Sequence, residues 1–479
     1  MKKDSFVILT FGYGYRLIDV VWSKVEDQAG YHISHIPHPS LFPSDTVPHI
    51  GPINPHQLFY LFDSPIKELD KADCAYLSEL EADKGPTINN IILGDARLSA
   101  LPYAEALGYI CAAAKRFREI FEEVKPTVVL GGFDGFQGTL AMLVCRKMDI
   151  PWFGLVYTPI PKGFTGFSPI NNSSETRSFG KINCSVIRQL AEQTLTEFET
   201  KVLAVRLPET ENTVWNVLTF LPLRTKNAIA KIKSIFSGNF DRYTHRTLTS
   251  SAKDYLRRRW NLYSNQRLEF LETPPDTPYV FFGFHMQPEM GIDVWAPFFS
   301  NQPYIINCIA RSIPPSHKLL VKLHKIDADH WSNAQLRSIE KMPGVVLVSS
   351  NANTQNFLRK ADIVFSIQGT IALEAALLGR PVITFGETMY EDLPTVTRVG
   401  SLIDLPLLVR TKLKDQQPSR QEILQGLEKL LFRFSPGLYN YWDNEPTASQ
   451  ITDFCAHLDQ LRCAIQESTK RDYLFRQAI

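Results

Sequence analysis

The feature that most constrains the fold is a regular alternation that begins at Pro278. Short apolar runs are separated by longer stretches in which apolar residues recur at helical spacing. Short buried strands that alternate with helices form a parallel sheet with right-handed crossovers. The sequence therefore predicts an α/β fold for this part of the chain. The five apolar runs are PYVFFGFH, HKLLVKLH, GVVLVSS, ADIVFSI and PVITFG.

The N-terminal part repeats this pattern with less clarity, from the strand SFVILTFG to the strand PWFGLVY. A chain of 479 residues is longer than one hydrophobic core supports. We therefore expect two Rossmann-like domains that face each other across a cleft, with a helical insertion or linker and a C-terminal helix. The predicted boundaries are 1–180 for the N-terminal domain, 181–275 for the helical segment, 276–440 for the C-terminal domain and 441–479 for the tail.

Charge and cysteine content exclude several classes of protein. The 51 Lys and Arg residues nearly balance the 50 Asp and Glu residues, which argues against a nucleic-acid-binding protein. The seven cysteines are scattered and form no CxxC pair, so we expect no disulfide framework, no zinc site and a cytoplasmic location. The first apolar run, Phe6 to Leu9, is too short for a signal peptide, and we expect no membrane span.

Histidines gather in residues 31–56, where five of them lie among six prolines. Metal binding is one interpretation, but a proline-broken segment with Asp45 as its one carboxylate and no cysteine is more typical of a loop over a cleft. We assign no metal and no cofactor.

Residues 224–259 form a basic segment, with ten Lys and Arg residues against Asp241 and Asp254. Two interpretations stay open. The segment is either a solvated helical face or a patch that is attracted to an anionic membrane surface. The second would make the protein peripheral on the inner face of the cytoplasmic membrane.

Polar residues follow two of the predicted C-terminal strands, at the edge where open α/β sheets bind ligands. His285, Gln287 and Glu289 come directly after YVFFG. Lys322 and His324 alternate with apolar residues at the end of the next strand, so both point to one face. The sequence therefore predicts an anion clamp, although a lone histidine here would more often be a packing residue.

The third polar group is SIQGTIALEAALLGRP, residues 366–381, which follows the strand ADIVF. After Gln368, Gly369 lets the backbone approach a ligand, and Thr370 offers a hydroxyl and an N-cap to a helix whose N-terminus favours phosphate. Glu374 would repel phosphate, so we interpret it as an acceptor for ribose hydroxyls; its alternative is a favourable charge in the first helical turn. Phosphate plus ribose indicates a nucleotide.

These motifs, with FHMQPEM, VKLHK, FGETMYED and VTRVG, resemble the capsule polysaccharide biosynthesis protein family, which includes bacterial Kdo transferases. The resemblance covers roughly residues 278–400 well. It implies a metal-independent GT-B glycosyltransferase with a cytidine nucleotide site at Gln287, Glu289, Lys322 and His324. Lys325 departs from the family, which usually has proline there. Tyr390 resembles a family position and is expected to wall the donor cleft, or else to be an ordinary half-buried tyrosine.

Asp134 is the candidate carboxylate on the acceptor side, because it follows the strand TVVL and the glycines Gly131 and Gly132. Glycosyl transfer needs a carboxylate, as base if configuration inverts or as nucleophile if it is retained. The alternative is an N-cap on the next helix. We assign catalytic roles to Asp134, Glu289 and His324, and substrate binding to His285, Gln287, Lys322, Gln368, Gly369, Thr370, Glu374 and Tyr390.

The predicted function is transfer of Kdo or a related acidic sugar from its CMP-activated form to a surface polysaccharide or its lipid-linked precursor. The nucleotide sugar is a substrate, and the glycan or glycolipid acceptor is the second partner. A sugar-nucleotide 2-epimerase of the same architecture is one alternative. A non-catalytic glycan- or lipid-binding subunit of an assembly or export complex is the other.

Overall fold

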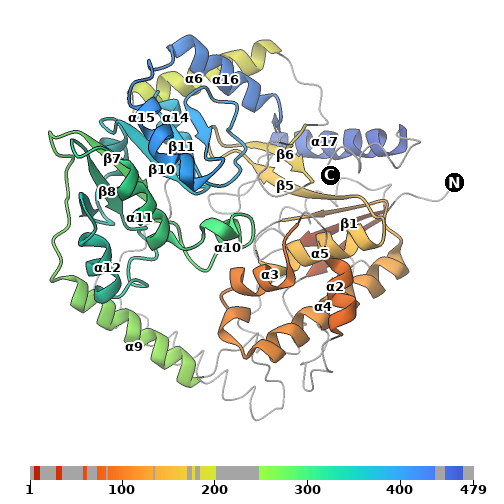
Figure 1. The fold of residues 1–479 in the computed structure, drawn as a ribbon. Coiled ribbons are helices and arrows are strands. Elements are labelled where there is room, and N and C mark those ends of the chain that lie inside the picture. Colours follow the sequence, from red (N-terminus) through yellow and green to blue (C-terminus); the bar gives the residue numbers. More distant parts are fainter. Residues whose placement is uncertain are drawn as a thin grey trace.

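The computed structural model describes two α/β domains, each built on one mainly parallel sheet, which lie side by side in Figure 1. All structural statements below apply to the described residues. These are residues 5–10, 29–34, 58–61, 73–81, 85–132, 135–169, 175–178, 184–200, 248–436 and 448–467.

The N-terminal sheet has seven strands in the order β13-β6-β5-β4-β1-β2-β3. The strands from β3 to β5 are parallel, and β6 and β13 are antiparallel at one edge. Every residue of β4 is buried, as expected for a parallel strand covered on both faces. The strands are β1 (Ser5–Thr10), β2 (Ala29–Ser34), β3 (Leu58–Tyr60), β4 (Val128–Gly131), β5 (Trp152–Tyr157), β6 (Phe164–Ser168) and β13 (Ser435–Pro436).

Amphipathic and buried helices cover this sheet. The longest of them, α4, buries an apolar stripe and ends at Lys125, whose φ of 50° is left-handed. The helix α5 is buried along most of its length, which agrees with its apolar sequence. The helices are α2 (Cys74–Leu80), α3 (Ile88–Gly94), η4 (Leu98–Ala100), α4 (Tyr103–Val124) and α5 (Phe136–Lys147).

The C-terminal sheet has six parallel strands in the order β12-β11-β10-β7-β8-β9. When the strands of this domain are numbered from one to six, their order is 3-2-1-4-5-6, as in doubly wound dinucleotide-binding sheets. In such sheets the direction in which successive strands are added changes between the first and the fourth strand. This switch point therefore lies between β7 and β10. The strands are β7 (Tyr279–Gly283), β8 (Lys318–Lys322), β9 (Val345–Val348), β10 (Ile363–Ser366), β11 (Val382–Thr384) and β12 (Val396–Arg398).

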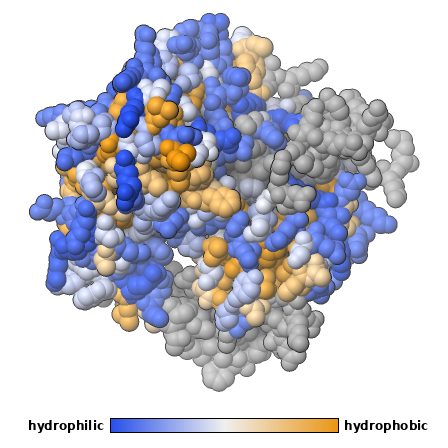
Figure 2. Space-filling view, in the orientation of Figure 1, coloured by the Kyte–Doolittle hydropathy of each residue, from blue (hydrophilic) through white to orange (hydrophobic). Residues whose placement is uncertain are grey.

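The helices of the C-terminal domain begin at local sequence signals. Capping boxes start α12 at Ser332 and α16 at Ser419. Figure 2 shows hydrophilic residues over much of the molecular surface in this view, interrupted by apolar patches. The helices are α10 (Met290–Asp293), η5 (Pro297–Phe299), α11 (Gln302–Ser312), α12 (Asn333–Glu340), α13 (Thr354–Leu358), α14 (Thr370–Leu377), η6 (Leu402–Asp404), α15 (Leu405–Lys412) and α16 (Arg420–Leu431).

The two domains exchange segments. The helix α6 (Cys184–Thr200) packs on α16, where Arg420 contacts Glu192 at 2.6 Å and Glu199 at 2.8 Å. In return, β13 joins the N-terminal sheet, and α17 (Ala448–Glu467) packs beside it, with the His457 ring 4.7 Å from the ring of Phe167. Figure 1 shows α6 next to α16, and α17 beside β6. The C-terminal helix thus packs back on the N-terminal domain, as its amphipathic sequence indicates.

The helical segment predicted at 181–275 contains α6 and α9 (Leu248–Asn265), and its residues 201–247 lie outside the described residues. Within the described ranges, no helix has both the length and the apolar character needed to cross a membrane. The boundaries at 180, 275 and 440 stay predictions.

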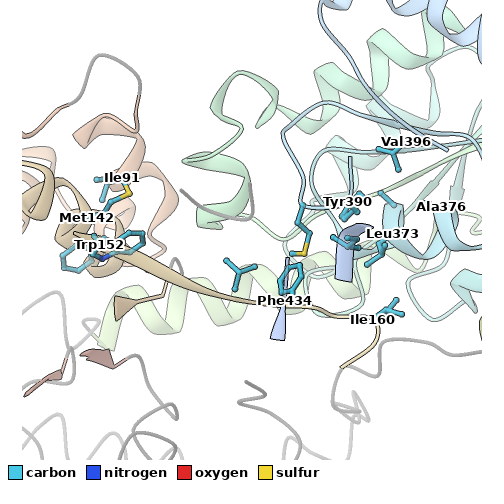
Figure 3. Packing of buried hydrophobic residues seen from close by; sticks show 14 of the residues in the cluster. Ile91, Met142, Trp152, Ile160, Leu373, Ala376, Tyr390, Val396 and Phe434 are labelled. Carbon is cyan, nitrogen blue, oxygen red and sulfur yellow. The ribbon is translucent and has the colours of Figure 1, made fainter. Parts of the chain in front are cut away.

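A continuous hydrophobic cluster joins the domains. Ile160 and Phe434 belong to the same cluster as Leu373 and Tyr390, and Figure 3 shows these four side chains near one another. Phe434 is fully buried and precedes β13, so it lies at the point where the chain passes from the C-terminal domain into the N-terminal sheet.

We predict that Phe434→Ala lowers the free energy of unfolding by about 3–5 kcal/mol, because it leaves a cavity in the core that joins the domains. Phe432→Ala is the matched control, since Phe432 lies two residues away and is 40% exposed. Chemical denaturation of both variants measures the difference. Equal losses in the two variants would contradict the proposed role of this cluster.

Candidate functional site

The three predicted polar groups meet at the switch point of the C-terminal sheet. The strands that they follow, β8, β7 and β10, are direct neighbours. His285 and Gly369 touch across this point, because a Cβ atom placed on Gly369 would lie 2.8 Å from His285 Cε1. The structure therefore brings together His285, Lys322, His324 and the beginning of α14 in the place that such sheets use for ligands.

His285 is fixed by the turn after β10. Its Nε2 accepts a hydrogen bond from the Ile367 N–H at 3.0 Å and lies 3.3 Å from Ser366 Oγ. Burial, with a contribution from His324, lowers the pKa of His285 to about 4, so the ring is neutral at pH 7. Because Nε2 accepts, the proton of the neutral ring sits on Nδ1. His285 therefore offers an N–H donor at Nδ1.

Lys322 and His324 supply further donors from the end of β8. Lys322 is buried, and its Nζ donates to the Ser350 carbonyl oxygen at 2.9 Å. Burial lowers its pKa to about 8. The pKa of His324 is also lowered, first by burial and then by Lys322. His324 Nδ1 accepts from the Ile326 N–H at 3.3 Å, so the neutral ring carries its proton on Nε2.

Lys325, which stands where the family usually has proline, adds positive charge to the site. It is the second cause, after burial, of the lowered pKa of Lys322. The turn that contains Lys325 is closed by the Asp327 N–H, which donates to the His324 carbonyl oxygen at 3.2 Å. The turn is therefore closed by a hydrogen bond although Lys325 stands in place of the usual proline. The ammonium group of Lys325 also lies near that of Lys322.

The glycine turn before α14 differs from the sequence prediction in one detail. Gly369 occupies the N-cap position, and α14 begins at the exposed Thr370, so the expectation that Thr370 caps this helix is wrong. The reason is local, because Ser366 Oγ accepts from the Gly369 N–H at 2.9 Å and starts the turn one residue earlier. No side chain caps α14, which leaves its N-terminus open to an anion.

Glu374 lies on the buried side of α14 beyond the first turn, so the alternative of a first-turn charge is not supported. Burial raises the pKa of its carboxyl group to about 7, while a hydrogen bond with Gln355 and the charge of Lys322 act in the opposite direction. Its predicted contact with ribose stays a prediction.

Tyr390 supports the glycine turn from the core. Its hydroxyl donates to the Gly369 carbonyl oxygen at 2.6 Å, and its ring is buried. Gln368 is held in a similar way, because its Nε2 donates to the Glu387 carbonyl oxygen at 2.9 Å. The predicted role of Tyr390 as a wall of the cleft stays a prediction, whereas its support of Gly369 is observed.

Both polar atoms of the Gln287 side chain form hydrogen bonds within the protein. Its Nε2 donates to Asp293 Oδ1 at 2.9 Å and to the Ser300 carbonyl oxygen at 2.8 Å, and its Oε1 accepts from Gln302 Nε2 at 2.8 Å. Glu289 is exposed, and its backbone N–H donates to Asp293 Oδ2 at 2.9 Å. Gln287 therefore shapes the turn after β7, and Glu289 lies at its exposed edge.

Sequence reasoning missed two supporting residues. Gln302 is fully buried; its Oε1 accepts from the His285 N–H at 2.8 Å, and its Nε2 donates to the His285 carbonyl oxygen at 3.1 Å. Ser350 follows β9 and holds Lys322. The polar run SSNANT after VVLV is a signal for Ser350, because it repeats the pattern of the other three groups. Gln302 stands alone at a helix start and gives no such signal.

Asp134 lies outside the described residues. The described residues before it end β4 at Gly131, and those after it begin α5 at Phe136. The switch point of the N-terminal sheet lies between β4 and β1. The N-cap of the following helix α5 is Gly135, with a φ of 82° and no side-chain cap. The N-cap position that was the alternative for Asp134 is therefore held by Gly135.

The assembled site is suited to an anion of the phosphate class. His285 and His324 interact electrostatically, as do His324 and Lys322, and His285 lies against Gly369 at the uncapped N-terminus of α14. Charge-assisted hydrogen bonds from such donors to an anion are strong. Among the described residues, no three His, Cys, Asp or Glu side chains group as a metal site; metal independence stays a prediction. Two doubly wound domains with this site define a GT-B-like α/β protein.

Comparison with known proteins confirms the expected resemblance. Residues 202–426 match the sequence profile of the family described as capsule polysaccharide biosynthesis protein. The match covers β7 to β12 and therefore the whole C-terminal part of the candidate site. No curated protein matches the chain in sequence.

Structural comparison finds distant similarity to several solved proteins. The KpsC beta Kdo 2,4 transferase of Thermosulfurimonas dismutans is 12% identical over 63% of this chain and 79% of its own, with a TM-score of 0.35. The beta Kdo 2,7 transferase of the same KpsC is 11% identical over 73% and 89%, with a TM-score of 0.33. The UDP-GlcNAc 2-epimerase of Neisseria meningitidis is 13% identical over 97% and 100%, with a TM-score of 0.30.

We predict that Gln302→Ala lowers the free energy of unfolding by about 2–4 kcal/mol, because it leaves three part-buried polar groups of His285 and Gln287 without the Gln302 partner, and each such group costs about 1–3 kcal/mol at most. Arg311→Ala, at an exposed position in the last turn of the same helix, serves as the control and should cost about 0.5 kcal/mol or less. Chemical denaturation compares the two. A small loss for Gln302→Ala would show that water replaces its hydrogen bonds.

Proposed function

We propose that the protein is a glycosyltransferase of capsule polysaccharide assembly, which moves Kdo or a related acidic sugar from its CMP-activated form. The acceptor is the growing polysaccharide or its lipid-linked precursor. The family match over residues 202–426 supports this assignment. The observation that carries it is the meeting of the donors of His285, Lys322 and His324 at the uncapped N-terminus of α14.

The chemistry of transfer explains why such donors are useful. The bond between the anomeric carbon and a phosphate oxygen breaks, and the departing CMP gains negative charge. Donors that already point at this oxygen stabilise the developing charge without reorganisation. His285 Nδ1–H, His324 Nε2–H and the Lys322 ammonium group fill this role in the proposal. Glu374 and the exposed Glu289 would contact the ribose and the sugar.

The acceptor side is proposed to come from the N-terminal domain. Asp134 lies in the connection after β4, at the switch point of that sheet, which is the position from which a loop reaches a ligand. Its carboxylate would act as base toward the acceptor hydroxyl if configuration inverts, or as nucleophile if it is retained.

A thermal-shift panel with CMP, UDP, GDP and dTDP tests the donor assignment, because a ligand that binds only the folded state raises its stability by about 2.7 kcal/mol at a hundred times its Kd. We expect CMP to give the largest shift. Incubation with the nucleotide sugar and a lipid-linked acceptor then tests the reaction. Release of an isomerised sugar nucleotide without acceptor would identify an epimerase instead, and tight binding without turnover would identify a binding subunit.

The lowered pKa of Lys322 predicts how CMP binding changes with pH. A phosphate favours the protonated amine, so the contribution of Lys322 is present below pH 8 and is lost as the pH rises through about 8 and beyond. Titration calorimetry from pH 7 to pH 9.5 should show this weakening for the wild type. Lys322→Gln should bind CMP at least about tenfold more weakly, the loss of one charged hydrogen bond, and should lack this pH dependence.

Lys318→Gln is the control for this measurement, because Lys318 begins the same strand and is exposed. It should bind CMP as the wild type does at every pH. If Lys322→Gln keeps the wild-type affinity, the anion does not bind beside this amine.

We predict that Asp134→Asn lowers the transfer rate by at least about a hundredfold, the usual scale for loss of a positioned acid–base group. Its melting temperature and CMP affinity should stay close to those of the wild type, because the donor contacts come from the other domain. Transfer rate, melting temperature and CMP affinity are measured on the same sample. An Asn variant that transfers sugar at the normal rate would remove Asp134 from the mechanism.

A further inference from the structure

A usual surface helix packs its apolar face on the protein and exposes its polar face, whereas α9 does the reverse. The face that packs on the C-terminal domain is polar and contains Arg258, Asn261 and Asn265. Arg258 contacts Asp329 at 2.8 Å, Asn261 Nδ2 donates to the Asp329 carbonyl oxygen at 3.0 Å, and Asn265 Nδ2 donates to the Trp331 carbonyl oxygen at 2.9 Å. These polar groups hold α9 to the domain through hydrogen bonds and an ion pair.

The outward face of α9 is apolar and aromatic. Leu256, Trp260 and Tyr263 follow one another at spacings of four and three residues, so they lie on one face. Their exposed fractions are 66%, 67% and 56%. The rings of Trp260 and Tyr263 lie 6.0 Å apart. Figure 1 shows α9 at the edge of the molecule next to α12.

Cations surround this face. At 100° per residue, Lys253 and Arg259 project within about one quarter turn of the Leu256 direction, and Arg257 lies just beyond. Arg267 follows the end of the helix. The guanidinium of Arg267 lies 5.8 Å from the Tyr263 ring, and that of Arg259 lies 5.4 Å from the Tyr255 ring. Arg257 contacts Asp254, the single acidic residue of α9, and keeps 48% of its side chain exposed.

We propose that α9 docks the protein on an anionic lipid surface through Leu256, Trp260 and Tyr263. Tryptophan and tyrosine favour the boundary between headgroups and acyl chains, and arginine and lysine beside them attract anionic headgroups. A second protein chain could also cover an apolar face, but the ring of cations favours a surface of uniform negative charge. Of the predicted basic segment 224–259, residues 224–247 lie outside the described residues.

The proposal corrects one detail of the sequence interpretation. Arg258 belongs to the same basic run as Arg257 and Arg259, yet it points inward and pairs with Asp254 and Asp329. It therefore holds the helix to the domain and takes no part in lipid binding.

Docking through α9 also places the candidate site near the lipid surface. The carbonyl groups that Asn261 and Asn265 bind belong to residues 329–331, and the same loop after β8 contains His324. The inference does not rest on the identity of the donor sugar, because lipid binding is measured without any transfer.

Vesicle sedimentation with the full chain tests the proposal, using phosphatidylcholine vesicles with and without phosphatidylglycerol. The wild type should bind only the anionic vesicles, and salt should weaken this binding. A charge variant, Lys253→Gln with Arg257→Gln and Arg259→Gln, should bind about a hundredfold more weakly, since each cation is worth about fivefold. A face variant, Leu256→Ser with Trp260→Ser and Tyr263→Ser, should lose at least about tenfold.

The control variant is Ile403→Ser with Leu407→Ser, which removes apolar side chains that are 85% and 68% exposed elsewhere on the same domain. It should bind vesicles as the wild type does, and all variants should keep the wild-type CMP-induced thermal shift. Anionic vesicles that sediment the face variant and the wild type equally would overturn the proposal. So would a dimer in ultracentrifugation that only the face variant breaks, combined with no vesicle binding.

Discussion

One hydrogen bond, from the backbone N–H of Ile367 to the side-chain Nε2 of His285 at 3.0 Å, determines the arrangement of the candidate site. It joins the ends of β7 and β10 at the switch point, beyond the last residues that these two strands pair with each other. It also fixes which ring nitrogen of His285 carries the proton. Position 369 requires glycine for the same reason, because any side chain there would collide with the imidazole ring of His285.

Burial shifts the pKa of each ionisable group of the site in the direction that favours its neutral form. It lowers the pKa of His285, Lys322 and His324 and raises the pKa of Glu374. A bound phosphate raises the pKa of the basic groups, because a nearby negative charge favours their protonated forms. Each unit of pKa shift corresponds to about 1.4 kcal/mol of binding free energy. With a pKa of about 8, Lys322 is already mostly protonated at pH 7, and a bound phosphate would raise its pKa further.

The sequence contains enough information to predict the sheets and the positions of the polar groups. Apolar runs such as VFFG and IVFS are buried strands, and parallel strands must end at a common edge, so His285, Lys322 and Gly369 had to approach one another. The N-cap of α14 could not be predicted in the same way, because Ser366 competes with Thr370 for the backbone of the turn.

Other features depend on distant contacts that no local pattern reports. Gln302 reaches His285 across 17 positions of sequence, and Tyr390 reaches Gly369 across 21. The inverted polarity of α9 was hidden as well, because the amphipathic pattern of a helix does not say which of its faces the rest of the protein covers.

The exchange of segments between the domains has a consequence for synthesis. In the finished protein, β13 covers the edge of the N-terminal sheet beside β6, and Ser178 near this edge contacts Ser435, which lies 257 positions later in the chain. A ribosome that adds about 5–20 residues each second needs on the order of tens of seconds to make that interval. During this time the beginning of β6, at Phe164 and Thr165, is an open edge that other unpaired strands can reach, whereas Phe167 can already pair with Arg177. The N-terminal sheet, although made first, is therefore completed among the last parts of the molecule.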